Sequence, residues 1–298
     1  MQQVSPTMFV AALLVAAGIS DTGAGQTVTN SANTGFVEVG DARLYYEETG
    51  RGAPIVLLHG SLLDRRSWDP QFDLLARSYR VVRYDARHHG NSSGGPGEFT
   101  NFDDLRAVLE ALGIDKATLL GLSQGGRTAI DFAIAYPDKV AALILVSPGA
   151  SGYERESAPV AKHSEEFGAA FVEGGVDAGI DYFLRQYVDG PTRSPSDVDA
   201  SVRNQVRRMA LGWVTTQNPE SVWKELEPPA IGRLDEIQAP TLVVVGDLDQ
   251  PYILELADMV KARAFDAEVA VIRGAAHMVN LEKPEAFNET VLGFLAGR

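Results

Sequence analysis

A serine that could act as a nucleophile stands in the segment GLSQG, residues 121–125. An apolar run, residues 118–120, precedes the segment, and a pattern typical of a helix follows it. A serine on a sharp strand-to-helix turn exposes its hydroxyl in a strained backbone conformation, so the residues two positions away must be small. The start of a helix also stabilises developing negative charge. The segment therefore indicates Ser123 as a nucleophile.

A serine hydroxyl needs a general base, and the base needs an acid that orients it. The chain has five histidines: His59, His88, His89, His163 and His277. His277 lies in a loop after the last predicted strand, where the base belongs if the order along the chain is serine, acid, histidine. Two acids, Asp247 and Asp249, follow the strand predicted at 241–245. Either could orient the imidazole, and the other would cap the turn or the next helix.

Two backbone N–H groups are candidates for stabilising an oxyanion. One belongs to Ser61, in the sequence HGS (59–61) that follows a short apolar run at 55–58. Glycine at this place lets the backbone come close to a reacting group. The other belongs to Gln124, directly after the serine. We expect His59 to bond within its own loop and to transfer no proton.

Alternating elements surround these residues. The predicted strands are a hairpin, 36–40 with 43–48, and the apolar runs 55–58, 80–84, 118–122, 142–146, 241–245 and 269–272. The predicted helices are 101–112, capped by Asn101, then 124–136 and 284–296. Continuous apolar strands between helices favour a doubly wound α/β fold with a mostly parallel sheet of about eight strands.

The alternation stops between residues 149 and 238. This segment has helical patterns and no convincing strand, and we interpret it as a helical cap inserted between two core parts, 36–148 and 239–298. Its aromatic residues are Phe167, Phe171, Tyr182, Phe183, Tyr187, Trp213 and Trp223. Because buried aromatic residues usually belong to a core, we expect them to hold the cap together rather than to contact substrate.

The N-terminal segment differs from the rest. Residues 8–19 form an apolar run that is too short for a stable membrane anchor but has the length of a signal-peptide core. We expect residues 1–25 to be a signal peptide and 26–35 a linker, which predicts a periplasmic or secreted protein. No Lys or Arg precedes Arg43, so a cytoplasmic location is the alternative.

Composition excludes several classes of function. The chain has 298 residues and no cysteine, which excludes disulfides and a thiolate nucleophile. The formal net charge of −14 disfavours nucleic acid and anionic membranes as partners. No set of three suitably spaced ligands indicates a metal site. Nothing in the sequence indicates an oligomeric state.

These segments together resemble the α/β-hydrolase family, specifically its cap-bearing, cofactor-free esterases, lactonases, perhydrolases and carbon–carbon bond hydrolases. The resemblance covers about residues 36–298 and rests on HGS (59–61), on YDAR (84–87) with Gly90 and Ser92, on GLSQG (121–125), on GDLD (246–249) and on Ala276 with His277. In that family the acid usually stands three residues after the glycine of a G-x-x-D segment, which implies Asp249 rather than Asp247. The resemblance implies no cofactor.

One segment departs from the family pattern. The family usually has glycine after the arginine of the YDAR segment, and this chain has His88 and His89. We expect His88 to be an exposed loop residue; the alternative is a role at the substrate entrance. Relatives that cleave epoxides or haloalkanes use aspartate at the nucleophile position, so serine at 123 argues against both activities.

The sequence thus predicts a small-molecule ester or lactone substrate, cleaved through an acyl-enzyme by Ser123, Asp249 and His277. A carbon–carbon bond hydrolase or enol-lactonase acting on aromatic breakdown products would use the same residues. It would need a cap arginine that faces the pocket, and the candidates are Arg155, Arg185, Arg193, Arg203, Arg207, Arg208 and Arg233. A ligand-binding receptor that retains the hydrolase residues is the alternative of another class.

Overall fold

The computed structural model describes residues 32–153 and 157–297. Contacts divide the chain into two units, Met1–Asn30 and Ser31–Arg298, and the description below concerns the second. The predicted signal peptide, residues 1–25, and the first part of the predicted linker lie outside the described residues. None of the described helices is long and apolar enough to cross a membrane.

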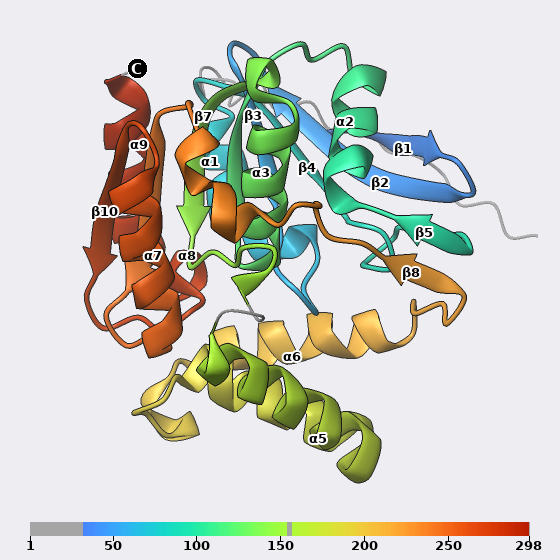
Figure 1. Ribbon diagram of the computed structural model, residues 1–298, viewed down its shortest axis with the longest axis vertical. Helices are drawn as coiled ribbons and strands as arrows, with labels where there is room; N and C mark the ends of the chain where they lie inside the picture. Colours follow the sequence, from blue (N-terminus) through green and yellow to red (C-terminus); the bar gives the residue numbers. More distant parts are fainter. Residues whose placement is uncertain (1–31, 154–156, 298) are drawn as a thin grey trace, which may run out of the picture. The chain divides into compact units, whose positions relative to one another are not determined.

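An eight-stranded sheet forms the centre of this unit (Figure 1). Its strands are β1 (Asn33–Val39), β2 (Ala42–Gly50), β3 (Pro54–Leu58), β4 (Arg80–Tyr84), β6 (Ala117–Leu122), β7 (Val140–Val146), β9 (Thr241–Gly246) and β10 (Ala267–Ile272). Their order in the sheet is β1-β2-β4-β3-β6-β7-β9-β10. The pairs β1–β2 and β2–β4 are antiparallel, and all other pairs are parallel. The predicted α/β fold and strand number are confirmed.

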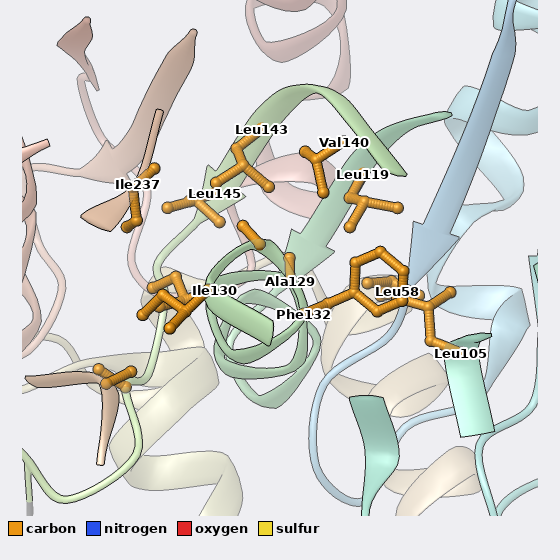
Figure 2. Packing of buried hydrophobic residues seen from close by; sticks show 14 of the residues in the cluster. Leu58, Leu105, Leu119, Ala129, Ile130, Phe132, Val140, Leu143, Leu145 and Ile237 are labelled. Carbon is orange, nitrogen blue, oxygen red and sulfur yellow. The ribbon is translucent and has the colours of Figure 1, made fainter. Parts of the chain in front are cut away.

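Helices cover both faces of the sheet because side chains alternate along the buried strands. Leu119, Leu143 and Leu145 point to the face covered by α2 (Asn101–Ala111), α3 (Gln124–Ala135) and α7 (Pro251–Arg263). Figure 2 shows Ala129, Ile130 and Phe132 of α3 within this cluster. The intervening residues, such as Leu120 and Ile144, point to α1 (Asp69–Leu75) and α9 (Pro284–Ala296) on the other face.

The cap is helical, as predicted. It contains α5 (Ala158–Phe183), a π-helix η3 (Leu184–Asp189) and α6 (Ala200–Val214), and α5 packs beside α6 (Figure 1). Gly175 interrupts α5 with a φ of 76°. The remaining short elements are η1 (Arg65–Trp68), η2 (Pro137–Lys139), η4 (Pro195–Asp197), η5 (Ala230–Glu236) and α8 (Val279–Glu282).

Three local predictions were wrong. The cap segment does contain a strand, β8 (Ser221–Trp223), which pairs in parallel with β5 (Gly97–Phe99) outside the main sheet. Three residues are too few to show an alternating pattern. The cap of α2 is Thr100 rather than Asn101, because the Thr100 hydroxyl accepts from the N–H of Asp103 at 3.2 Å. Strand β1 begins at Asn33, inside the predicted linker, because β2 is long enough to pair with it there.

Candidate active site

Ser123 lies between β6 and α3 with a φ of 54° and a ψ of −109°. This backbone conformation is rare for a residue with a side chain, and it is the strained turn that the sequence predicted. A Cβ atom on Gly121 would lie 2.3 Å from the Gly125 carbonyl oxygen, and one on Gly125 would lie 2.1 Å from the Leu58 carbonyl oxygen. Both glycines are therefore required by direct backbone contact around the serine.

His277, in the loop after β10, and Asp249, in the loop after β9, lie together. The Nδ1 atom of His277 is 3.0 Å from Oδ2 and 3.1 Å from Oδ1 of Asp249, and both side chains are buried. A carboxylate only accepts, so Nδ1 carries the proton and Nε2 presents its lone pair. Within the described residues, the buried Nε2 atom has no hydrogen-bond partner. It forms no hydrogen bond with Ser123 in this structure.

Asp247, the other candidate acid, is exposed and points elsewhere. Its Oδ1 accepts from the backbone N–H of Gly274 at 2.6 Å. This bond joins the loop after β9 to the loop after β10, which carries His277. Asp247 therefore links two loops, and the expectation that it caps its own turn or the next helix was wrong.

Ser61 and Gln124 lie beside Ser123. The Ser61 hydroxyl donates to Oε1 of Gln124 at 2.5 Å, which ties the loop after β3 to the start of α3. Among the described atoms, neither backbone N–H has an acceptor. A Cβ on Gly60 would lie 3.3 Å from the Cβ of Ser123, so the two loops are in contact. His59 bonds to the Gly60 carbonyl at 2.9 Å and accepts from the N–H of Ala86 at 2.9 Å, which suits a structural role.

A cavity of about 250 Å³ opens over Ser123, Ser61 and Gln124. Its other lining residues are Arg127, Pro148, Gly149, Ala150, Tyr153, Val160, His163, Ser164, Phe167, Phe183, Tyr187, Trp223, Tyr252 and Ile253. Four of the seven cap aromatics are in this set, so the expectation that they only hold the cap together was wrong. A helical pattern alone does not tell which face of a cap helix turns toward the core. Tyr187 also touches His277, with ring centroids 4.6 Å apart.

The arginine on the cavity wall, Arg127, comes from the core and not from the cap. The sequence did not indicate this residue. None of the cap arginines that the structure describes lines the cavity. Arg127 does so, because it stands one helical turn after Ser123 on α3. Its guanidinium pairs with Glu225 at 2.9 Å and lies 5.2 Å from the Trp223 ring centroid. Only its position four residues after the nucleophile could have pointed to it.

His88 is buried, contrary to expectation. Its Nδ1 bonds to the Thr216 carbonyl at 3.2 Å, and its Nε2 to the Ser221 hydroxyl at 2.7 Å. Burial lowers the pKa of His88. The residue fastens β8 and the end of the cap to the core and does not line the cavity. Its partners lie about 130 residues away in sequence, so no local pattern reveals them.

The fold and site define a hydrolase, and comparison with known proteins gives its family. Residues 55–290 match the family model described as the alpha/beta hydrolase family, and the chain belongs to this family. It is 30% identical to a 2-hydroxy-6-oxononadienedioate/2-hydroxy-6-oxononatrienedioate hydrolase of Burkholderia vietnamiensis, over 90% of this chain and 97% of the relative. It is 29% identical to a putative carbamate hydrolase, RutD, of Azorhizobium caulinodans, over 87% and 97%.

Among solved structures, the chain is similar to Est816, described as an N-acyl homoserine lactone degrading enzyme. The TM-score is 0.72 at 28% sequence identity, and the match covers 87% of this chain and all of the other. The relatives thus include hydrolases with several different substrates on one fold, so the substrate of this chain has to be argued from its own cavity.

Proposed function

We propose that this protein hydrolyses a carboxylic ester or lactone through an acyl-enzyme on Ser123. The observation that carries the proposal is the state of His277. Its Nδ1 is held by a buried carboxylate, and its buried Nε2 has no partner within the described residues. Leaving a buried polar atom without a partner costs about 1–3 kcal/mol. A role for Nε2 as acceptor of the proton of a serine hydroxyl explains why this atom is kept without a partner.

In the proposed mechanism, Ser123 attacks the carbonyl carbon while His277 Nε2 takes its proton. The carbonyl π electrons move to the oxygen, which the N–H groups of Ser61 and Gln124 stabilise. The tetrahedral intermediate collapses, and His277 returns the proton to the leaving alkoxide. Water then attacks the acyl-enzyme by the same route and releases the acid. Asp249 stabilises the imidazolium that forms in each step.

Replacement of the nucleophile tests this proposal. Ser123→Ala is expected to lower kcat on p-nitrophenyl esters by about 10⁵-fold or more while the circular dichroism spectrum stays unchanged. A fluorophosphonate is expected to label the wild type at Ser123 and not the variant. Ester turnover by a folded Ser123→Ala protein at the wild-type rate contradicts the proposal. Wild-type protein that is labelled once but shows no multiple turnover would support the receptor alternative.

The charge of the cavity favours neutral substrates. Arg127 is the single Arg or Lys among the described lining residues, and Glu225 neutralises it. A substrate that carries a free carboxylate would have to displace Glu225 from Arg127. Otherwise its charge would remain unpaired in a mostly apolar cavity, which is unfavourable. The similarity to Est816 supports a lactone or ester, and the similarity to the Burkholderia enzyme supports a carbon–carbon bond hydrolase as the second candidate.

A turnover screen separates these candidates. We expect p-nitrophenyl esters and uncharged lactones to be cleaved with a higher kcat/KM than a dienone dicarboxylate. The opposite order would establish the second candidate. Glu225→Gln serves as a diagnostic variant, because removing the carboxylate that pairs with Arg127 is expected to improve KM only for substrates that carry an anionic group.

We also propose that residues 1–25 are removed during export. The proposal is supported by the apolar run at 8–19 and the small residues that follow it. N-terminal sequencing of the protein recovered from cells should give a chain that starts near Gln26. Recovery of the intact Met1 terminus from the cytoplasm would support the alternative location.

A further inference from the structure

His163 is a second imidazole at the cavity, contributed by the cap helix α5. Its Nε2 lies 2.7 Å from the Tyr187 hydroxyl, and its Nδ1 lies 3.1 Å from the Tyr182 hydroxyl. Tyr182 in turn donates to Oε2 of Glu166 at 3.0 Å. The four side chains form a continuous hydrogen-bonded series that ends at the cavity wall.

The Glu166 carboxylate, at one end of this series, determines which group donates and which accepts in each hydrogen bond. The Glu166 carboxylate can only accept, so Tyr182 spends its single proton on that bond and can only accept from His163. The Nδ1 atom of His163 must therefore carry a proton. A neutral His163 then has a lone pair on Nε2, and Tyr187 donates to it. The neutral form of His163 thus fixes the orientation of the Tyr187 hydroxyl.

Tyr187 connects this series to His277. The Tyr187 ring lies 5.2 Å from the His163 ring and 4.6 Å from the His277 ring, measured between centroids, so it is in contact with both imidazoles. The groups that face His163 are Glu166 and Tyr182 from α5, Tyr187 from η3, Tyr252 from α7, and His277. Burial lowers the pKa of His163, and the nearby His277 lowers it further, against the opposing effect of Glu166.

We propose that His163 is a positioning residue, whose neutral imidazole holds Tyr187 against His277 and so fixes the position of the His277 imidazole. The inference rests on the proposed role of His277. Protonation of His163 reverses its bond to Tyr187, since Nε2–H then donates. It also places a positive charge beside an imidazole that must itself become positive in the transition state. Turnover therefore requires both histidines to be neutral.

The pH dependence of kcat/KM on a p-nitrophenyl ester tests the inference. For the wild type, a plot of log kcat/KM against pH is expected to steepen on the acid side from a slope of one to a slope of two. His163→Gln keeps a hydrogen-bonding side chain but cannot titrate, and its acid limb is expected to keep a slope of one. Its plateau kcat should fall about tenfold, with KM within about twofold of the wild type, as for a misplaced catalytic group.

A matched control is Glu165→Gln, which removes a charge from the same helix at an exposed position. It should retain the wild-type plateau and the slope of two. Tyr187→Phe keeps the ring against His277 and deletes the hydroxyl, and its plateau kcat should also fall about tenfold. Equal slopes in wild type and His163→Gln, or a wild-type plateau in Tyr187→Phe, overturn the inference. Activity in Ser123→Ala would instead overturn the proposed function.

Discussion

The imidazole of His277 lies against the carboxylate of Asp249, with Nδ1 3.0 Å from Oδ2 and almost no solvent contact for either side chain. Asparagine at 249 could keep the packing but would favour the tautomer with the proton on Nε2. We expect Asp249→Asn to lower kcat by about 10⁴-fold at unchanged stability, since the analogous change in a well-known serine protease has this effect. Steady-state kinetics with a p-nitrophenyl ester would measure it.

Asp247→Asn is the matched control for this change. Asp247 accepts one backbone N–H at 2.6 Å on the surface and touches no proposed catalytic group. An amide oxygen can accept the same bond, so kcat should stay within about twofold. If Asp247→Asn abolished turnover and Asp249→Asn did not, the assignment of the acid would have to be reversed.

The close approach of α3 to the end of β3 gives a second prediction. A Cβ on Gly125 would lie 2.1 Å from the Leu58 carbonyl oxygen, and backbone cannot give way as a flexible side chain can. We expect Gly125→Ala to lower the free energy of unfolding by about 3 kcal/mol and to reduce ester turnover, because the oxyanion donors move with this contact. Urea denaturation and kinetics on the same preparation would test both effects.

Gly293→Ala is the control for helix glycines. Gly293 lies in α9. Apart from its chain neighbours and the backbone of its own helix, no heavy atom of the described residues would lie within 4 Å of an added Cβ. The substitution should raise the free energy of unfolding by roughly 0.5–1 kcal/mol and leave activity unchanged. Similar losses at both positions would mean that the contact with Leu58 does not determine the effect at Gly125.

A buried ion pair gives a third prediction. The Arg87 guanidinium binds both carboxylate oxygens of Asp104, at 2.8 and 2.7 Å, and joins the loop after β4 to α2. Burial raises the pKa of Asp104 despite this partner. Arg87→Met leaves the carboxylate unpaired and should destabilise the protein by about 3–5 kcal/mol. The double variant with Asp104→Leu should recover part of this loss, and additive losses would contradict the pairing.

The sequence predicted the elements that carry a strong local signal. All eight strands of the main sheet were expected, the first two as a hairpin and the others as apolar runs, and α9 was bounded correctly because Pro284 opens it. Ser123 was placed at its turn for a similar reason, since a Cβ on Gly121 would meet the backbone of Gly125 only four residues further along the chain. The backbone imposes these features locally, so they can be inferred from neighbouring residues.

The parts that the sequence did not predict depend on contacts between distant segments. His88 is buried because Thr216 and Ser221 close over it, and neither is near it in the chain. Among the five histidines, His163 was given no role from the sequence, and its place at the cavity depends on how α5 packs against η3 and α7. Side-chain identity does not determine which face of a cap helix turns inward.

The last prediction concerns the attachment of the cap. Asp131 on α3 accepts from the Ser151 hydroxyl at 2.6 Å, and the same hydroxyl accepts from the N–H of Ala230 at 2.8 Å. These bonds tie the segments that enter and leave the cap to the core. Burial raises the pKa of Asp131 to about 6, above its ordinary value of 3.8. The folded protein therefore binds this proton more tightly than the unfolded chain does.

A raised pKa means that the associated stability is fully present below pH 3.8 and is lost as the pH rises through about 6. Over this window the wild type should lose about 3 kcal/mol of unfolding free energy relative to Asp131→Asn, which resembles the protonated carboxyl and cannot ionise. Urea denaturation at pH 4 should give similar stabilities for the two proteins, and at pH 7.5 the variant should be the more stable. A constant difference across this range would show that folding does not raise the pKa of Asp131, and its bond to Ser151 would then contribute equally at both pH values.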